Sequence, residues 1–149
     1  MRMAFFFDQS RCMACNICTV ACKDFYGVNP GPVRWRRQFT YEDSPAPADP
    51  REKAVGDVNL FYNLAMSCNH CEQPACVDAC ASGAIYKRED GIVMVDRDKC
   101  TDLQACIAAC PFGAPAIADD KQEPSREHTW MVRHPMQKCN MCAELIDKG

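Results

Sequence analysis

The stretch that decides the fold is residues 12–22, CMACNICTVAC, which places four cysteines in the spacing C-x2-C-x2-C-x3-C. Three further cysteine groups follow along the chain of 149 residues. They are Cys68, Cys71, Cys76 and Cys80, then Cys100, Cys106 and Cys110, and finally Cys139 and Cys142. All thirteen cysteines belong to one of these groups, so the sequence is an internal repeat with variations.

A cysteine content this high is compatible with a disulfide scaffold, with zinc sites or with iron–sulfur clusters. Disulfides need an oxidising compartment and normally an even number of cysteines, whereas the count here is odd. We also expect no signal peptide, because the apolar run at residues 4–7 is too short. The spacing of the first group is typical of paired 4Fe–4S sites, in which three thiolates wrap one cluster and the fourth reaches a second. The sequence therefore predicts iron–sulfur clusters in pairs.

The second and third groups are separated by two β-prone runs, residues 84–87 and 92–95, which flank Asp90-Gly91 and predict a hairpin. These two groups are therefore expected to form the halves of one two-cluster unit. The predicted ligands of its 4Fe–4S cluster are Cys68, Cys71, Cys76 and Cys110.

The other cluster of this unit would be held by Cys80, Cys100 and Cys106. Leu103 stands where its fourth cysteine is expected, and leucine cannot bind iron. A cubane that lacks one thiolate most readily loses the iron at that corner, so we predict a 3Fe–4S cluster. A 4Fe–4S cluster with a non-cysteine or solvent ligand is the alternative.

The first and fourth groups pair in the same way but leave two incomplete sets. One set is Cys12, Cys15 and Cys18, and the other is Cys22, Cys139 and Cys142. Each set lacks one cysteine within this chain.

This organisation predicts an α+β, ferredoxin-like fold with two pseudo-symmetric lobes, each built for two clusters. The outer lobe would comprise residues 1–55 with 119–149, and the central lobe residues 56–118. Further strands are expected at residues 5–7 and 129–132, and loops at 29–32 and 42–53. No run is long enough for a large amphipathic helix or for a membrane span.

Composition and the remaining motifs argue against nucleic-acid binding and against a zinc site. A net charge of −3 and a pI near 5.6 argue against nucleic acid as a partner. The basic run at residues 34–37 is then a solvated strand face or a docking patch. His70 is expected to donate a hydrogen bond to cluster sulfur or to a carbonyl rather than to bind metal. A zinc ribbon of Cys68, Cys71, Cys139 and Cys142 is the alternative metal site, but it leaves nine cysteines without a role.

The cysteine groups also carry a resemblance to a known family. The segments DQSRCMACNICTVACKDF, SCNHCEQPACVDACASGAIYKREDGIVMVDRDKC, CIAACPFGAP and KCNMC are similar to the iron–sulfur subunits of the dimethyl sulfoxide reductase family of molybdopterin oxidoreductases. The resemblance implies an electron-transfer subunit of anaerobic respiration that is not itself catalytic. Its partners would be a molybdopterin-containing catalytic subunit and a quinol-oxidising membrane anchor.

The same resemblance implies a peripheral place in a membrane-associated complex, without indicating on which side of the membrane the complex lies. Family members carry two more cysteines beyond the position of Gly149, which implies a chain truncated at its C-terminus. A zinc-stabilised interaction module and a non-functional truncated fragment are the alternative interpretations.

Overall fold

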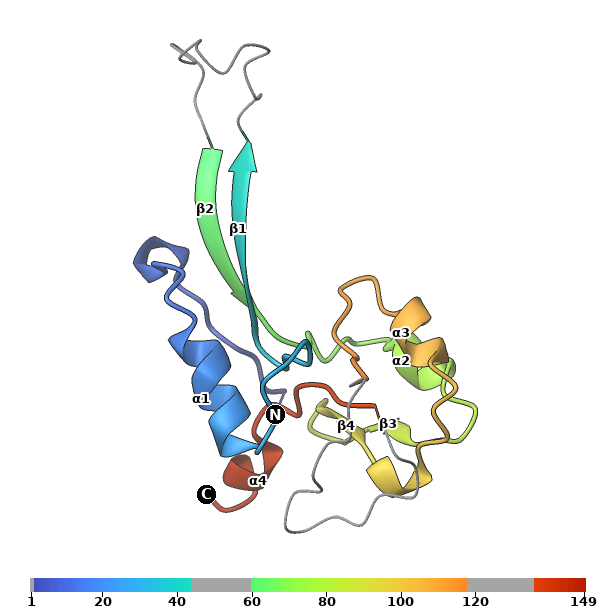
Figure 1. Cartoon of the computed structure of the whole chain (residues 1–149). Coiled ribbons are helices and arrows are strands. Elements are labelled where there is room, and N and C mark those ends of the chain that lie inside the picture. Colours follow the sequence, from blue (N-terminus) through green and yellow to red (C-terminus); the bar gives the residue numbers. More distant parts are fainter. Residues whose placement is uncertain (1, 44–59, 118–135) are drawn as a thin grey trace, which may run out of the picture.

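The computed structural model describes residues 2–43, 60–117 and 136–149. They form a small α+β fold of short elements, as predicted (Figure 1). In chain order these are η1 (Gln9–Arg11), α1 (Ile17–Phe25), β1 (Arg37–Asp43), β2 (Leu60–Met66), α2 (Ala75–Asp78), β3 (Ile85–Lys87), β4 (Val93–Val95), η2 (Arg97–Lys99), α3 (Ala105–Ala109) and α4 (Ala143–Ile146). None of the described helices is long and apolar enough to cross a membrane.

The longest strands form a hairpin that extends away from β3 and β4, with η1 and the first cysteine group beside it (Figure 1). β1 and β2 pair antiparallel from Arg37 opposite Met66 to Asp43 opposite Leu60. This hairpin was not predicted from the sequence, and the loop predicted to begin at residue 42 was wrong there, because β1 continues to Asp43. The rest of that predicted loop lies outside the described residues. The predicted lobe boundary at residue 55 falls between the two paired strands.

The predicted hairpin between the second and third cysteine groups is confirmed. β3 pairs antiparallel with β4, Ile85 opposite Val95 and Lys87 opposite Val93. The turn uses Gly91 at a φ of +85°, a conformation that L side chains rarely adopt. Ile85 and Val93 point into the core and are 3% and 1% exposed. Through these two residues the hairpin packs against Cys100 and Cys106 in the core.

Two other expectations for the N-terminal half are corrected by the structure. Residues 5–7 are not a strand, and the guanidinium of Arg36 lies over the Phe5 ring at 5.4 Å. The loop at residues 29–32 is confirmed as irregular. The basic run at 34–37 is not a solvated strand face, because Trp35 is only 5% exposed. Arg37 instead donates to the carbonyl of Gly113 at 2.6 Å. The strand expected at 129–132 lies outside the described residues.

Among the described residues, three clusters of buried side chains make up the core. The first comprises Val28, Val33, Trp35, Cys68, Ala114 and Cys139. The second comprises Ala84, Ile85, Val93, Cys100, Cys106 and Met136. The third comprises Ile92, Met141 and Ala143. Each cluster combines residues predicted for the outer lobe with residues predicted for the central lobe, so the two sets of residues pack together.

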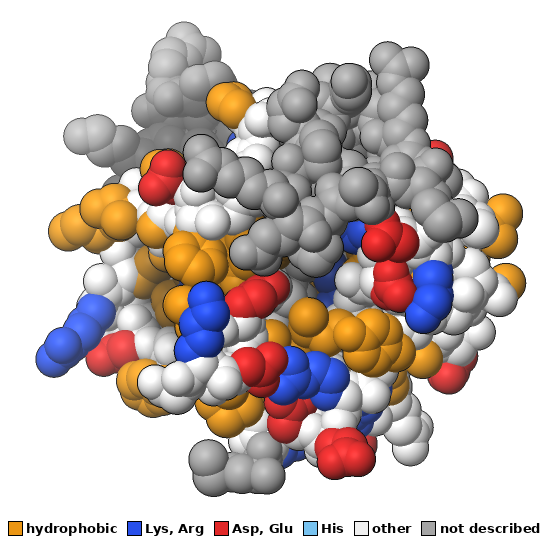
Figure 2. Space-filling model, turned by 90° about the horizontal axis from the view of Figure 1, so that it is seen from below, with side chains coloured by type: hydrophobic (Ala, Val, Ile, Leu, Met, Phe, Trp, Pro, Cys, Tyr) orange, Lys and Arg blue, Asp and Glu red, His pale blue; other side chains and the backbone are white. Residues whose placement is uncertain are grey.

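Ion pairs join the C-terminal helix to the rest of the fold. Arg88 contacts Asp147 at 2.6 Å and Asp90 at 2.9 Å, which ties the end of α4 to the β3–β4 turn. Figure 2 shows charged side chains of both signs side by side on this lower face, interrupted by apolar side chains. Exposed pairs of this kind contribute at most about 1 kcal/mol each, so they orient α4 more than they stabilise it.

Candidate iron–sulfur cluster sites

All four cysteine groups contain the same backbone feature. In each group, the residue two positions after the first cysteine has a positive φ: 58° at Ala14, 43° at His70, 55° at Asp102 and 58° at Met141. None of these residues is glycine, so each conformation costs free energy that other contacts must offset. A left-handed residue within such a turn directs successive backbone N–H groups into one concave space, which suits anions and iron–sulfur sites. The four loops therefore share a left-handed residue at the same position, a feature that is typical of loops around negatively charged groups.

The first and third groups share still more of their structure. Each begins with a 3-10 helix whose C-cap is a cysteine, Cys12 after η1 and Cys100 after η2. Each then enters an α-helix through a left-handed N-cap, Asn16 at φ 59° and Gln104 at φ 58°. The two groups are thus repeats in conformation as well as in sequence.

The missing ligand can be located by this repeat. Cys15 lies three residues after Cys12, and Leu103 lies three residues after Cys100. Leu103 therefore occupies the structural position of a cysteine. Its side chain is on the surface, 66% exposed, where a large apolar residue gains little from burial.

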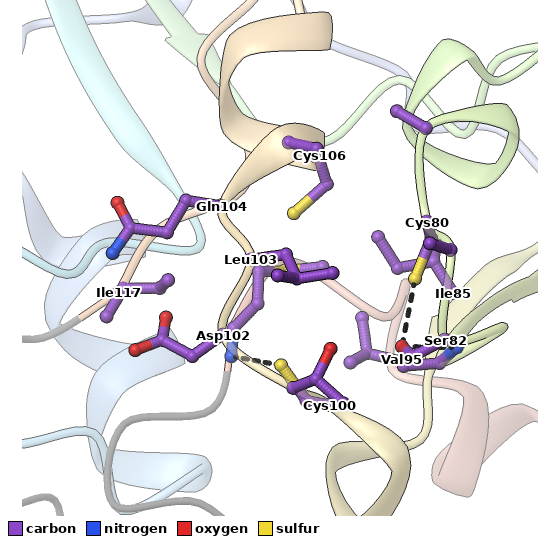
Figure 3. A pocket seen from close by; sticks show the side chains of 16 residues that line it. Cys80, Ser82, Ile85, Val95, Cys100, Asp102, Leu103, Gln104, Cys106 and Ile117 are labelled. Atoms are coloured by element: carbon purple, nitrogen blue, oxygen red, sulfur yellow. Dashed lines mark hydrogen bonds between the residues drawn. The ribbon is translucent and has the colours of Figure 1, made fainter.

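Cys80, Cys100 and Cys106 line one cavity together with Leu103. Figure 3 shows the three sulfur atoms directed toward a shared space, with Leu103 beside it. Burial, reinforced by the neighbouring Cys80 and Cys100, raises the pKa of Cys106 to about 11. The three thiols are thus close enough to disfavour one another's ionisation, and a metal binds such thiols only with loss of their protons.

Hydrogen-bond donors surround the sulfur of Cys80. Burial raises the pKa of the Cys80 thiol. The hydroxyl of Ser82, at 3.5 Å, and the backbone N–H groups of Ile85 and Ala84 lower this pKa by a larger amount, so the net shift is downward. Elsewhere a backbone N–H donates to sulfur from Met136 to Cys100 at 3.4 Å, from Ala114 to Cys110 at 3.4 Å and from Met141 to Cys139 at 3.3 Å. Such donors stabilise a thiolate, which is the form that binds iron.

Three of the four predicted ligands of the central 4Fe–4S set act on one another. Burial raises the pKa of Cys76, Lys138 opposes the shift, and Cys68 and Cys110 add to it. Cys68 is buried and packs in the first core cluster, with Cys110 against its edge. Cys71 is partly buried on the same loop as Cys68.

The first and fourth groups also meet. Burial raises the pKa of Cys22 to about 11, and the next largest contributions come from Cys139 and Cys142. Figure 1 shows α4 below the C-terminal end of α1, and a hydrogen bond of 3.1 Å joins Tyr26, the C-cap of α1, to Glu144 of α4. Chain segments more than a hundred residues apart are thus brought together at three cysteines.

The last set, Cys12, Cys15 and Cys18, lies where η1 leads into α1. Cys15 is exposed, and the other two are partly buried. The carbonyl of Cys12 accepts a hydrogen bond of 3.2 Å from Asn63 on β2, which fixes this loop to the long hairpin.

The zinc ribbon required Cys68, Cys71, Cys139 and Cys142 around one ion. Within residues 2–43, 60–117 and 136–149, no group of three or more His, Cys, Asp and Glu side chains is arranged to hold a single metal ion.

His70 provides a test of whether a cluster fits the central set. Its Nδ1 accepts a hydrogen bond of 2.9 Å from the N–H of Val93, so the ring proton of the neutral form is on Nε2. Burial, and next the charge of Lys138, lower the His70 pKa to about 4, which keeps the ring neutral at pH 7. Nε2 is buried and has no hydrogen-bond partner among the described residues. A cluster held by the flanking Cys68 and Cys71 would supply sulfur acceptors for this donor, so the residues fit the group.

Two residues of the site were not predicted from the sequence. Lys138 is 3% exposed and Trp35 is 5% exposed, although lysine and a tryptophan flanked by arginines are normally surface residues. The only signal in the sequence was that Lys138 directly precedes a cysteine motif.

Comparison with known proteins agrees with this geometry. Residues 59–149 match the family described as 4Fe-4S dicluster domain. The B subunit of the anaerobic dimethyl sulfoxide reductase of Escherichia coli (strain K12) is 40% identical over 146 residues, which cover 97% of this chain and 63% of the relative.

Two relatives carry other names. The thiosulfate reductase electron transfer subunit of Salmonella typhi is 41% identical over 137 residues, which are 92% of this chain and 60% of the relative. The formate dehydrogenase iron-sulfur subunit of Wolinella succinogenes is 35% identical over 142 residues, which are 95% of this chain and 61% of the relative. The chain thus spans less than two thirds of the length of these relatives. The match over residues 59–149, together with four cysteine loops of one conformation, shows that the chain belongs to the 4Fe-4S dicluster domain family.

Proposed function

We propose that the chain is an electron-transfer subunit that relays electrons through iron–sulfur clusters and performs no substrate chemistry itself. The observation that carries this proposal is the gathering of thiols from separate parts of the sequence into common sites. Cys80, Cys100 and Cys106 line one cavity, and one core cluster contains Cys68 and Cys139 with Cys22 and Cys110 packed against it. Iron–sulfur clusters, when bound, accept and release single electrons.

The proposed ligands of the central 4Fe–4S cluster are Cys68, Cys71, Cys76 and Cys110. Those of the proposed 3Fe–4S cluster are Cys80, Cys100 and Cys106. The remaining sets are Cys12, Cys15 and Cys18, and Cys22, Cys139 and Cys142, each one ligand short within this chain. The chain's own residues then have three tasks, which are to bind the clusters, to exclude water from them and to direct N–H donors at the ligand sulfurs.

The two-lobe organisation also remains our proposal, with residues 1–55 and 119–149 forming the outer lobe and 56–118 the central one. The repeated conformation around Cys12 and Cys100 supports a duplication of this kind. Pairing of β1 with β2 and the shared core would hold the two lobes in a fixed relation.

We further propose that electrons enter from a quinol-oxidising membrane anchor and leave to a molybdopterin-containing catalytic subunit. The names of the relatives support this, since they are subunits of dimethyl sulfoxide reductase, thiosulfate reductase and formate dehydrogenase. The chain would then lie in a membrane-associated complex as a peripheral component.

Metal and sulfide analysis of the protein purified without oxygen tests the relay function. We expect a brown protein that contains iron and acid-labile sulfide and shows electron paramagnetic resonance (EPR) signals of iron–sulfur clusters after reduction. A colourless protein that contains zinc and no labile sulfide would contradict the proposal and support an interaction module.

Leu103→Cys should convert the proposed 3Fe–4S cluster into a 4Fe–4S cluster, because the new thiolate is placed at the corner that lacks a ligand. The near-isotropic EPR signal of the oxidised protein should disappear, and iron content should rise by one atom per chain. Leu103→Ala is the matched control, since it removes the same side chain without adding a thiol and should retain the signal. Wild-type protein that shows only cubane signals would contradict the prediction.

A further inference from the structure

A buried lysine lies between two of the cysteine sets. Lys138 is 3% exposed, and its Nζ donates to the carbonyl of Val93, to the carbonyl of Cys139 at 2.9 Å and to the Sγ of Cys68 at 3.7 Å. These three acceptors match the three N–H bonds of an ammonium group, whereas a neutral amine has only two. The geometry is therefore that of a charged lysine held in the interior.

Among the hydrogen-bond acceptors of this ammonium within the described part of the chain, the sulfur of Cys68 is the one that can carry a balancing negative charge. None of the ion pairs formed within the described part of the chain involves Lys138. A buried cation without a countercharge is destabilising by several kcal/mol. The same Nζ contacts the Sγ of Cys68 at 3.7 Å and the backbone carbonyl of Cys139 at 2.9 Å. The ammonium therefore lies beside a ligand of the central set and beside a ligand of the set formed by Cys22, Cys139 and Cys142.

We propose that Lys138 is a positioning residue that raises the reduction potentials of the two clusters on either side of it, most strongly the one held by Cys68. This inference rests on the proposed relay function. Reduction adds a negative charge to a cluster, and a fixed positive charge at hydrogen-bond distance favours the reduced state. Burial strengthens the effect, because little water remains to screen the interaction.

The position of Lys138 also suits a bridge between the two sites. One hydrogen bond reaches a sulfur of the central set, and another reaches the backbone of a cysteine in the other set. The third fixes the side chain to β4, a rigid element of the core. A single charge thereby shifts both potentials in the same direction, so the difference between the two potentials changes by less than the larger of the two shifts.

The test is a potentiometric titration, followed by EPR, of the iron-loaded full chain in its complex. Lys138→Met removes the charge and keeps the length of the side chain. We expect it to shift the one-electron equilibrium of the cluster held by Cys68 at least tenfold toward the oxidised state, a fall of about 59 mV in midpoint potential. Lys138→Arg, which keeps the charge, should retain a potential near that of the wild type. Lys148→Met, on an exposed lysine, is the matched control and should cause no shift.

A Lys138→Met protein with full iron content and unchanged potentials would overturn the inference and leave the relay function standing. Absence of any iron–sulfur signal in the unaltered protein would instead overturn the relay function itself.

A second measurement covers the case in which the Lys138 variants do not assemble. The unaltered protein is prepared with lysine labelled with 15N only at Nζ, and the reduced clusters are studied by pulsed EPR. We expect a 15N coupling, because Nζ lies 3.7 Å from a ligand sulfur. Reduced clusters without that coupling would show that no lysine ammonium contacts them, which would overturn the inference.

Discussion

Removing iron with a chelator under anaerobic conditions is expected to abolish the cooperative thermal unfolding transition of the protein. Cys68 and Cys139 belong to the first core cluster, and Cys100 and Cys106 to the second. Cys100 and Cys106 line one cavity, and Cys68 lines another, so side-chain packing around these thiols is incomplete. The regular elements are short, and α2, α3 and α4 have only four or five residues each, far below the length at which isolated helices are stable. The free energy of cluster binding is therefore largely the free energy of folding.

Far-UV circular dichroism and limited proteolysis, before and after chelation, measure this effect. Adding back iron with sulfide should restore the transition, and adding zinc alone should not. A chelated protein that still melts cooperatively at the same temperature would show that the side-chain core is sufficient without the clusters.

Trp35→Ala is expected to lower the free energy of unfolding of the iron-loaded protein by about 3–5 kcal/mol, the usual cost of deleting a buried aromatic ring. The ring lies 4.4 Å from that of Tyr26 between centroids, and the guanidinium of Arg97 lies over it at 5.1 Å. Its Nε1 donates to Gln137 at 3.3 Å. The ring packs in the core cluster that contains Cys68, so its loss would also loosen the loop that holds this ligand.

Urea unfolding followed by circular dichroism gives the change for Trp35→Ala. Phe39→Ala is the matched control, because Phe39 is an aromatic residue on the long hairpin with 44% of its surface exposed. Its loss should cost well under half as much. Equal effects of the two substitutions would mean that Trp35 is not part of the core.

Several features were predictable because they follow from local chemistry. The Asp-Gly turn between two β-prone runs sufficed for the β3–β4 hairpin, since few residues tolerate the backbone of such a turn. The position of Leu103 followed from the repeat of cysteine spacing, and the structure repeats the loop conformation as well. The four left-handed residues were not predictable, because Ala14, His70, Asp102 and Met141 share no local preference for that conformation.

Other features depended on contacts distant in sequence. The β1–β2 hairpin was missed because its strands are separated by a long proline-rich segment, so no short turn signal marks the pairing. Residues 5–7 look like a strand, but local propensity does not supply a partner, and the structure leaves them unpaired. Trp35 looked solvated because charged neighbours dominate its local sequence.

The sequence by itself determined the kind of cofactor and the number of loops that receive it, because cysteine spacing is a local property that sets which thiols a single turn can direct at one cluster. Only the tertiary structure decided what surrounds those loops. Lys138 and His70 are both buried through hydrogen bonds to Val93 of β4, a strand far from each of them in the sequence. These contacts make Lys138 an interior charge and direct the other ring nitrogen of His70 away from the strand. The physical reason is that burial and electrostatic coupling depend on three-dimensional proximity, which cysteine spacing does not encode.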